Sequence, residues 1–231
     1  MMKRMRERGT RRKKLAVAGA LVVAIGLLAA GLAFGAAPII GQGDDTYSAP
    51  TYTIDQGEVG QLQVTGSTHN VTARQSGPDG QALFRTPTIS GGSTGVQGTQ
   101  FLSAGDYTFF CTVHPTTMQA TLHVTSNGAP QARPSAQVSV RSKKLSKVSK
   151  KGILVALTTT AKVDGASLVA KVGKTTVAKL DGLSLAAGQQ FATLKLSKAG
   201  KSALKKKKKA SVTVTATIPF GSPASAKSKL T

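Results

Sequence analysis

Hydrophobic and polar residues alternate in short runs along most of the chain after residue 38. In the first half, glycine-rich turns separate runs at residues 52–54, 61–64, 70–73 and 120–124. Alternation at a period of two places every second side chain on one face, as in a strand with one buried side. Short strands separated by turns are typical of a β-sandwich. We therefore expect a first all-β domain over residues 46–126.

A second series of alternating runs follows, at residues 137–140, 153–157, 168–172, 191–196 and 211–218. Residues 198–208 depart from this pattern and predict either a short basic helix or an exposed connection. Asn127, Gly128, Pro130 and Pro134 lie between the two series without apolar periodicity, which indicates a linker at 127–135. We expect a second all-β domain over residues 136–231.

An uncharged apolar stretch precedes both domains. Residues 15–37 are almost entirely Ala, Val, Leu, Ile, Gly and Phe, and about 20 helical residues suffice to cross a membrane. Residues 1–14 are strongly basic, and basic flanks are retained in the cytoplasm. The pattern predicts a transmembrane helix, or a signal segment that is cleaved, with both domains outside the cytoplasm.

Charge divides the chain in the same way. The formal net charge is +22, yet residues 46–126 carry −2 and residues 127–231 carry +19, including the lysine run at 205–209. Such a distribution bears on partners and solubility rather than on fold. It indicates two modules with different surroundings.

The only cysteine, Cys111, excludes an intrachain disulfide. An unpaired thiol in an exported protein needs another explanation, and metal ligation supplies one. Tyr107, Phe109 and Cys111 share one face of a predicted strand, so the sulfur points into the domain. His114 and Met118 follow in the next turn, and His69 lies 42 residues upstream, next to Asn70.

The segment 105–124, with its Cys-x2-His-x3-Met pattern and the upstream His-Asn pair, resembles the copper loop of plastocyanin-like and amicyanin-like cupredoxins. The resemblance implies a Greek-key β-sandwich and one type 1 copper ion bound by His69, Cys111, His114 and Met118. Thiolate and two imidazoles form the trigonal set of such sites, and a thioether is the weak axial ligand. The resemblance also implies that Asn70 braces the ligand segments and that electrons enter at His114, beside Pro115.

Several alternatives stay open at this stage. Three residues separate His114 from Met118, whereas the related loops have two or four, so an oxygen atom is an alternative axial ligand. A zinc-occupied or vestigial site is an alternative to copper. His123 alternates with Leu122 and Val124, which predicts a solvent-facing histidine that binds no metal.

The second domain is similar to the immunoglobulin-like β-sandwiches of bacterial surface proteins. Its lysines indicate binding to an anionic cell-wall polymer or a membrane surface, with a simply solvated face as the alternative. Nucleic acid is not expected, because no aromatic residues interleave with the lysines.

Together these features predict an extracytoplasmic electron carrier that cycles between Cu(II) and Cu(I) and serves an unidentified redox protein. It is not expected to be an enzyme, because the chain has three histidines and the site uses two. The alternatives are a copper-storage protein of the envelope and a structural surface protein whose site is unused.

Overall fold

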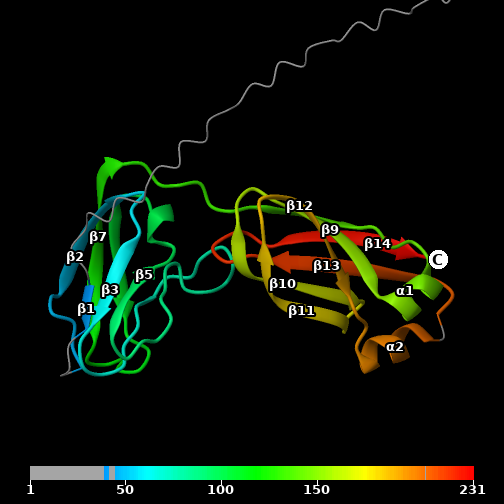
Figure 1. The fold of residues 1–231 in the computed structure, drawn as a ribbon, viewed down its shortest axis with the longest axis horizontal. Coiled ribbons are helices and arrows are strands. Elements are labelled where there is room, and N and C mark those ends of the chain that lie inside the picture. Colours follow the sequence, from blue (N-terminus) through cyan, green and yellow to red (C-terminus); the bar gives the residue numbers. More distant parts are fainter. Residues whose placement is uncertain (1–38, 42–44, 206) are drawn as a thin grey trace, which may run out of the picture. The chain divides into compact units, whose positions relative to one another are not determined.

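The computed structural model describes residues 39–41, 45–205 and 207–231. Within them the regular structure consists mostly of β-strands, with two short helices (Figure 1), which confirms the all-β prediction. The basic segment 1–14 and the apolar stretch 15–37 lie outside these residues. In the described part of the chain, no helix is long and apolar enough to cross a membrane.

The first part of the chain forms two sheets that share one core. One sheet has the order β1-β3-β5 and the other β2-β7-β6-β4. β1 pairs with β3 and β2 pairs with β7 in parallel, whereas the remaining neighbours are antiparallel. The bounds are β1 Ile39–Gly41, β2 Thr51–Gln56, β3 Gly60–Val64, β4 Thr72–Ala73, β5 Gly92–Val96, β6 Gly105–Phe110 and β7 Gln119–Gly128, with a 3-10 turn η1 at Thr99–Phe101.

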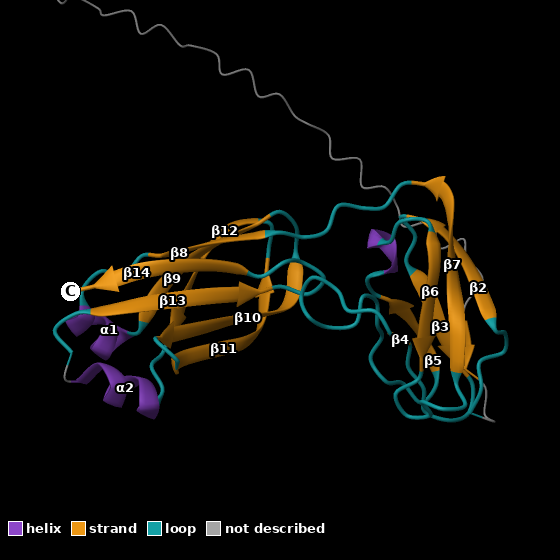
Figure 2. Cartoon of the chain, turned by 180° about the vertical axis from the view of Figure 1, so that it is seen from behind, coloured by secondary structure: helices purple, strands orange, loops and turns teal. Residues whose placement is uncertain are grey.

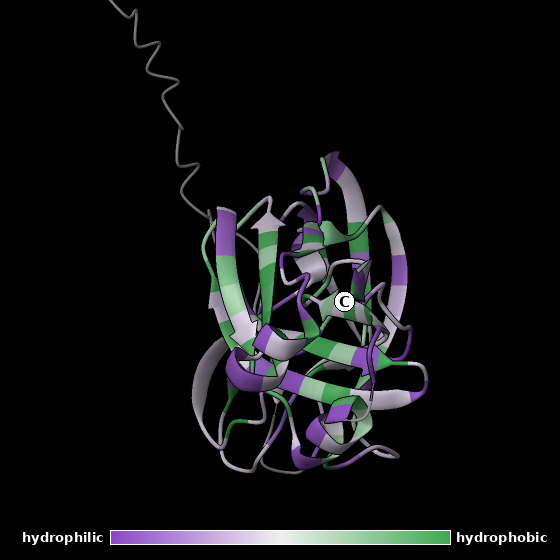
Figure 3. Cartoon of the chain, turned by 90° about the vertical axis from the view of Figure 1, so that its right-hand side faces the viewer, coloured by the Kyte–Doolittle hydropathy of each residue, from purple (hydrophilic) through white to green (hydrophobic). Residues whose placement is uncertain are grey.

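The predicted alternation of polarity accounts for this packing. Buried and more exposed positions alternate along β2 and β3, and Figure 3 shows a similar alternation of apolar and polar residues along strands of the chain. Side chains from both sheets, among them Leu62, Val96, Phe109 and Leu122, are fully buried in a single cluster. Complete burial of each such side chain contributes roughly 1.5–3 kcal/mol. The two sheets therefore form a sandwich with one continuous core.

The first sandwich differs from its predicted extent at three places. β1 lies before residue 46, where the domain was expected to begin. β7 continues to Gly128, two residues into the expected linker. The run at 70–73 yields only the two-residue strand β4, because His69 and Val71 exchange backbone hydrogen bonds with the segment around Thr86 and Ile89 instead.

The second part of the chain also forms two sheets, with the orders β12-β9-β8 and β11-β10-β13-β14. All neighbouring strands in these sheets are antiparallel. The bounds are β8 Ala136–Val140, β9 Ile153–Thr159, β10 Val163–Val172, β11 Thr175–Leu185, β12 Gly188–Leu194, β13 Ala210–Thr217 and β14 Ala224–Leu230. β13 alternates between buried and half-buried positions along its whole length.

Two short helices interrupt the strands of this second sandwich. α2, Lys198–Lys205, shows that the helical alternative for 198–208 is correct. α1, Leu145–Lys151, was not predicted. Both helices lie at the same end of the sandwich (Figure 2). Leu145, Val148 and Leu204 attach them to its core.

Candidate metal centre

A closed loop between β6 and β7 carries three of the four predicted ligands. Cys111 follows β6 directly, and Met118 directly precedes β7. The Cys111 amide donates to the Met118 carbonyl and the Met118 amide to the His114 carbonyl, each at 3.0 Å. The three-residue spacing between His114 and Met118 thus closes one hydrogen-bonded turn. These bonds fix the shape of the loop through the backbone alone.

His69 reaches the same place from a separate segment. Its amide and carbonyl both bond to Ile89, each at 2.9 Å, which holds the backbone of His69 as a single bridge between strands. The next residue, Asn70, accepts from the Thr112 amide at 2.9 Å. Its amide group donates to the hydroxyls of Thr88 at 2.9 Å and Thr112 at 2.6 Å. Asn70 therefore joins the His69 segment to the loop that follows Cys111.

The ligand atoms of His69, Cys111 and His114 converge within 4.8 Å of one another. The Cys111 sulfur lies 4.0 Å from Nδ1 of His114, and the two imidazole ring centres are 5.2 Å apart. His69 and Cys111 are fully buried, whereas 22% of the His114 side chain is exposed. A soft sulfur and two nitrogens in a nearly closed pocket are the donor set of a trigonal copper site.

Met118 is fully buried and lies on the same side of this cluster as Gly41 of β1. A methyl group added at Gly41 would meet the His69 ring at 2.8 Å and the Met118 terminal methyl at 3.2 Å. The imidazole and the thioether therefore pack against one glycine, where a larger residue would displace them. Met118 and His69 therefore lie close together beside Gly41.

Asp45 contacts the solvent-facing side of His114. Its carboxylate Oδ1 lies 3.3 Å from Nε2 of His114, and its carbonyl accepts a hydrogen bond from the Thr117 hydroxyl at 3.4 Å. A carboxylate on the outer nitrogen leaves Nδ1, which faces the Cys111 sulfur, as the nitrogen available to a metal. Asp45 thus holds the outer nitrogen of His114, while Nδ1 faces Cys111.

An aromatic cluster packs beneath the ligands. The ring of Tyr47 lies 5.0 Å from that of Phe109, and Phe109 also contacts Tyr52 and Phe84. The Tyr47 hydroxyl donates to the Asn70 carbonyl at 2.6 Å. Burial, together with the nearby Cys111, raises the pKa of Tyr47 above its usual value, so the phenol stays protonated and keeps donating.

The third histidine lies elsewhere. His123 is on the exposed face of β7, with 48% of its side chain exposed, and pairs with Asp106 at 2.6 Å. The predicted solvent-facing orientation of His123 is confirmed.

The Cys-x2-His-x3-Met pattern and the resemblance to cupredoxins predicted His69, Asn70, Cys111, His114 and Met118, and the structure places these five residues close together. No pattern in the sequence pointed to Gly41, Asp45 or Tyr47. These three residues lie before or at the edge of the expected domain and approach the site only through folding. The parallel pairing of β1 with β3 brings Gly41 to the candidate site. Such a pairing joins distant segments and cannot be predicted from a local pattern.

Comparisons with known proteins return structural neighbours only. No family model and no curated protein matches the chain. A reduced Cu(I) form of an amicyanin variant is 23% identical over 38% of this chain and 81% of its own, with a TM-score of 0.29. A purple cupredoxin from Nitrosopumilus maritimus is 22% identical over 38% of this chain and 99% of its own, with a TM-score of 0.31. The geometry of the site, and not this likeness, supports the function proposed next.

Proposed function

We propose that this protein binds one copper ion in a type 1 site and carries single electrons. His69, Cys111 and His114 would hold the ion, and Met118 would be its weak axial ligand. The convergence of one sulfur and two nitrogens within 4.8 Å, drawn from two separate segments, is the observation that supports this proposal. When bound, copper supplies one-electron chemistry by changing between Cu(II) and Cu(I).

The surrounding residues suit electron transfer rather than storage. The two backbone bonds that close the ligand loop and the Asn70 bonds to Thr88 and Thr112 hold the donors independently of the metal. A rigid donor set limits the rearrangement that accompanies a change of charge on the ion. Burial of His69 and Cys111 excludes water, and only His114 reaches the surface, where it provides one point of exchange.

The finer fold and location also belong to this proposal. We assign the first sandwich to the cupredoxin Greek-key fold and the second to an immunoglobulin-like support. A basic segment followed by an apolar one at 1–37 supports placement of both outside the cytoplasm, by anchoring or by export. The partner would be a redox protein that docks at the His114 surface.

Spectroscopy of the copper-loaded chain tests the proposal. The full chain in a nonionic detergent, stripped of metal and titrated with Cu(II), is expected to give an intense visible thiolate-to-copper band and narrow hyperfine splitting in its electron paramagnetic resonance spectrum. Cys111→Ser removes the thiolate and should abolish both signals. His123→Asn is the matched control, because it removes the histidine that lies outside the site and should leave both signals unchanged.

Three other results would contradict the proposal. Copper binding without a thiolate band, or binding that is insensitive to Cys111→Ser, would exclude a type 1 site. A thiolate band that disappears irreversibly on one-electron reduction would instead indicate copper storage. Reversible voltammetry with fast electron exchange is the result expected for a carrier.

A further inference from the structure

Positive charge in the second sandwich is concentrated at the end where its helices lie. α1 joins β8 to β9, and α2 joins β12 to β13. The register places Ile153 opposite Leu194 and Ala210 opposite Leu230, so both helices and the end of β14 meet at one end of the sandwich. Figure 1 shows α1 and α2 there.

The two acidic residues of this sandwich lie towards the other end. Asp164 is the second residue of β10, and Asp181 lies in the second half of β11. Each pairs with an adjacent lysine, Lys162 at 3.3 Å and Lys179 at 3.0 Å. The helical end therefore carries lysines without acidic neighbours among the described residues.

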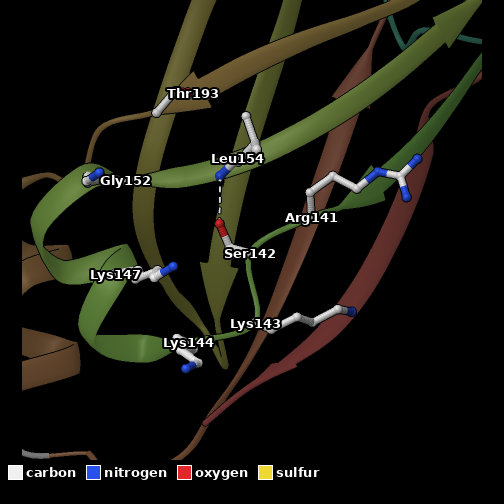
Figure 4. A pocket seen from close by; sticks show the side chains of 9 residues that line it. Arg141, Ser142, Lys143, Lys144, Lys147, Gly152, Leu154 and Thr193 are labelled. Carbon is white, nitrogen blue, oxygen red and sulfur yellow. Dashed lines mark hydrogen bonds between the residues drawn. The ribbon is translucent and has the colours of Figure 1, made fainter.

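A hollow of about 450 Å³ opens at this end, between the segment after β8, helix α1 and the edge of β9. Five basic side chains line it: Arg141, Lys143, Lys144, Lys147 and Lys151. Figure 4 shows the labelled members of this group arranged around the hydrogen bond from the Leu154 amide to the Ser142 hydroxyl, which is 2.9 Å long. Leu154 is 39% exposed and provides an apolar wall.

Helix α1 is held so that Lys147 and Lys151, together with Lys144 before it, line this hollow. Leu145 and Val148 are buried in the core, which turns Lys144, Lys147 and Lys151 to a common outer face at helical spacing. Gly152 ends the helix with φ 91°, and its amide donates to the Val148 carbonyl at 2.9 Å. A methyl group at Gly152 would meet the Leu194 carbonyl at 2.5 Å, so only glycine allows this close approach.

The charges on α1 are unfavourable to one another without a counter-ion. Like charges at this spacing destabilise a helix, and α1 has no acidic residue in its first turn and no side-chain cap. Of the ion pairs between described residues, none involves the five basic side chains of the hollow. An external anion would relieve this repulsion.

Two further hollows continue around the same end. One is lined by Lys205, Lys207 and Lys208 together with residues from the other side of α1, and the next by Lys209 and Lys229. Both include Thr231, so they adjoin each other. A succession of basic hollows fits an extended chain with repeated charges better than a single ion or a flat bilayer.

We propose that the helical end of the second sandwich binds a linear polymer of closely spaced oxyanions, with its main contact at the hollow lined by Lys144, Lys147 and Lys151. The lysine ammonium groups pair with successive anionic groups, and Leu154 contacts the backbone of the polymer. This binding is independent of copper.

Inorganic polyphosphate of short, defined length is the probe that tests the site. Calorimetric titration of the full chain in nonionic detergent compares the wild type with Lys147→Gln/Lys151→Gln. The control is Lys162→Gln/Lys179→Gln, which removes the same charge at two positions away from the helical end. If each removed lysine lowers the affinity for polyphosphate about fivefold, the first variant should bind roughly 30-fold more weakly than the wild type. The control variant should bind about twofold more weakly or less. The slope of log K against log salt should become shallower by about 1.4 in the first variant only.

Each other outcome overturns the proposal. Equal losses in both variants would mean diffuse attraction without a site. Orthophosphate binding as tightly as polyphosphate would mean a single-ion site. Phosphatidylglycerol micelles that bind the wild type while polyphosphate does not would identify a lipid surface as the ligand.

Circular dichroism and thermal unfolding check that both variants fold, and Lys144→Gln, at the N-terminal boundary of α1, supplies a second pocket variant.

Discussion

The ligand loop of the first sandwich and the helical end of the second use charged and polar side chains in opposite ways. At the loop, the functional groups are short and mostly buried, and backbone and Asn70 hydrogen bonds hold the segments that carry them. At the helical end, the lysines are long, exposed and outside the ion pairs of the described residues. A metal ion needs fixed donors, whereas a polymer with many charges tolerates adjustable ones. Substitutions near the loop should therefore have large, specific effects, and those at the helical end should have smaller, additive ones.

The largest expected effect comes from the core beneath the ligands. Phe109→Ala removes a fully buried ring that contacts Tyr47, Tyr52 and Phe84, and should lower the free energy of unfolding of the first sandwich by about 3–5 kcal/mol. Copper binding should weaken, while polyphosphate binding stays unchanged. Chemical denaturation followed by both binding assays checks this. Equal weakening of copper binding and polyphosphate binding would instead show that the stabilities of the two sandwiches are coupled.

Asn70→Ala should have the next largest effect. It leaves the Thr112 amide and two hydroxyls without their partner, at a cost of about 2–3 kcal/mol in unfolding free energy. Copper affinity should fall about 10–100-fold, because the ligand segments are no longer joined. Competition titration with a chelator measures this fall. Asn127→Ala, on an exposed residue, is the control, and a comparable loss there would contradict the bracing role.

Gly41→Ala tests the packing of His69 against Met118. The added methyl group would lie 2.8 Å from the His69 ring, so one ligand must move, at a cost of about 1–2 kcal/mol. We expect an altered axial interaction, visible as a shifted thiolate-to-copper band and a changed hyperfine splitting. Gly60→Ala introduces the same methyl group with its nearest contact at 3.7 Å, and its spectrum should match that of the wild type.

Asp45→Asn should give the smallest effect. Removing the carboxylate 3.3 Å from His114 Nε2 makes the imidazole a poorer donor to Cu(II). The reduction potential should therefore rise by a few tens of millivolts, less than the roughly 59 mV of a tenfold change. Asp106→Asn removes the same charge beside His123, outside the site, and should leave the potential unchanged. In the metal-free chain, nitrogen chemical shifts of His114 should show a weaker preference for protonated Nε2 in Asp45→Asn.

Local patterns in the sequence were sufficient to predict most strands, whereas the ligand set also needed the resemblance to cupredoxins. The alternation that buries Val212 and Val214 in β13 can be predicted from the sequence, because a period of two involves only neighbouring residues. The spacing of Cys111, His114 and Met118 is readable for the same reason, since one turn contains all three. The bracing role of Asn70 followed only from the family resemblance, and its partner Thr112 was not predicted.

Features that depend on distant segments were not readable. Helix α1 has only two buried residues, Leu145 and Val148, among lysines and serines, and its position depends on the close approach of Gly152 to Leu194. Gly41 and Asp45 likewise reach the metal site through the pairing of β1 with β3 and a contact across the sandwich. Such contacts are set by three-dimensional packing, which no short window of sequence records.

β7 separates the ligand loop of the first sandwich from the point where the chain continues to the second. The strand starts directly after Met118 and runs ten residues to Gly128, where the chain leaves for the second sandwich. At about 3.3 Å per residue this is roughly 30 Å. The chain therefore leaves the first sandwich at one end of β7, and the His114 surface lies at the other end. Within this sandwich, a partner that contacts His114 would therefore meet the ligand loop and not the end from which the chain continues.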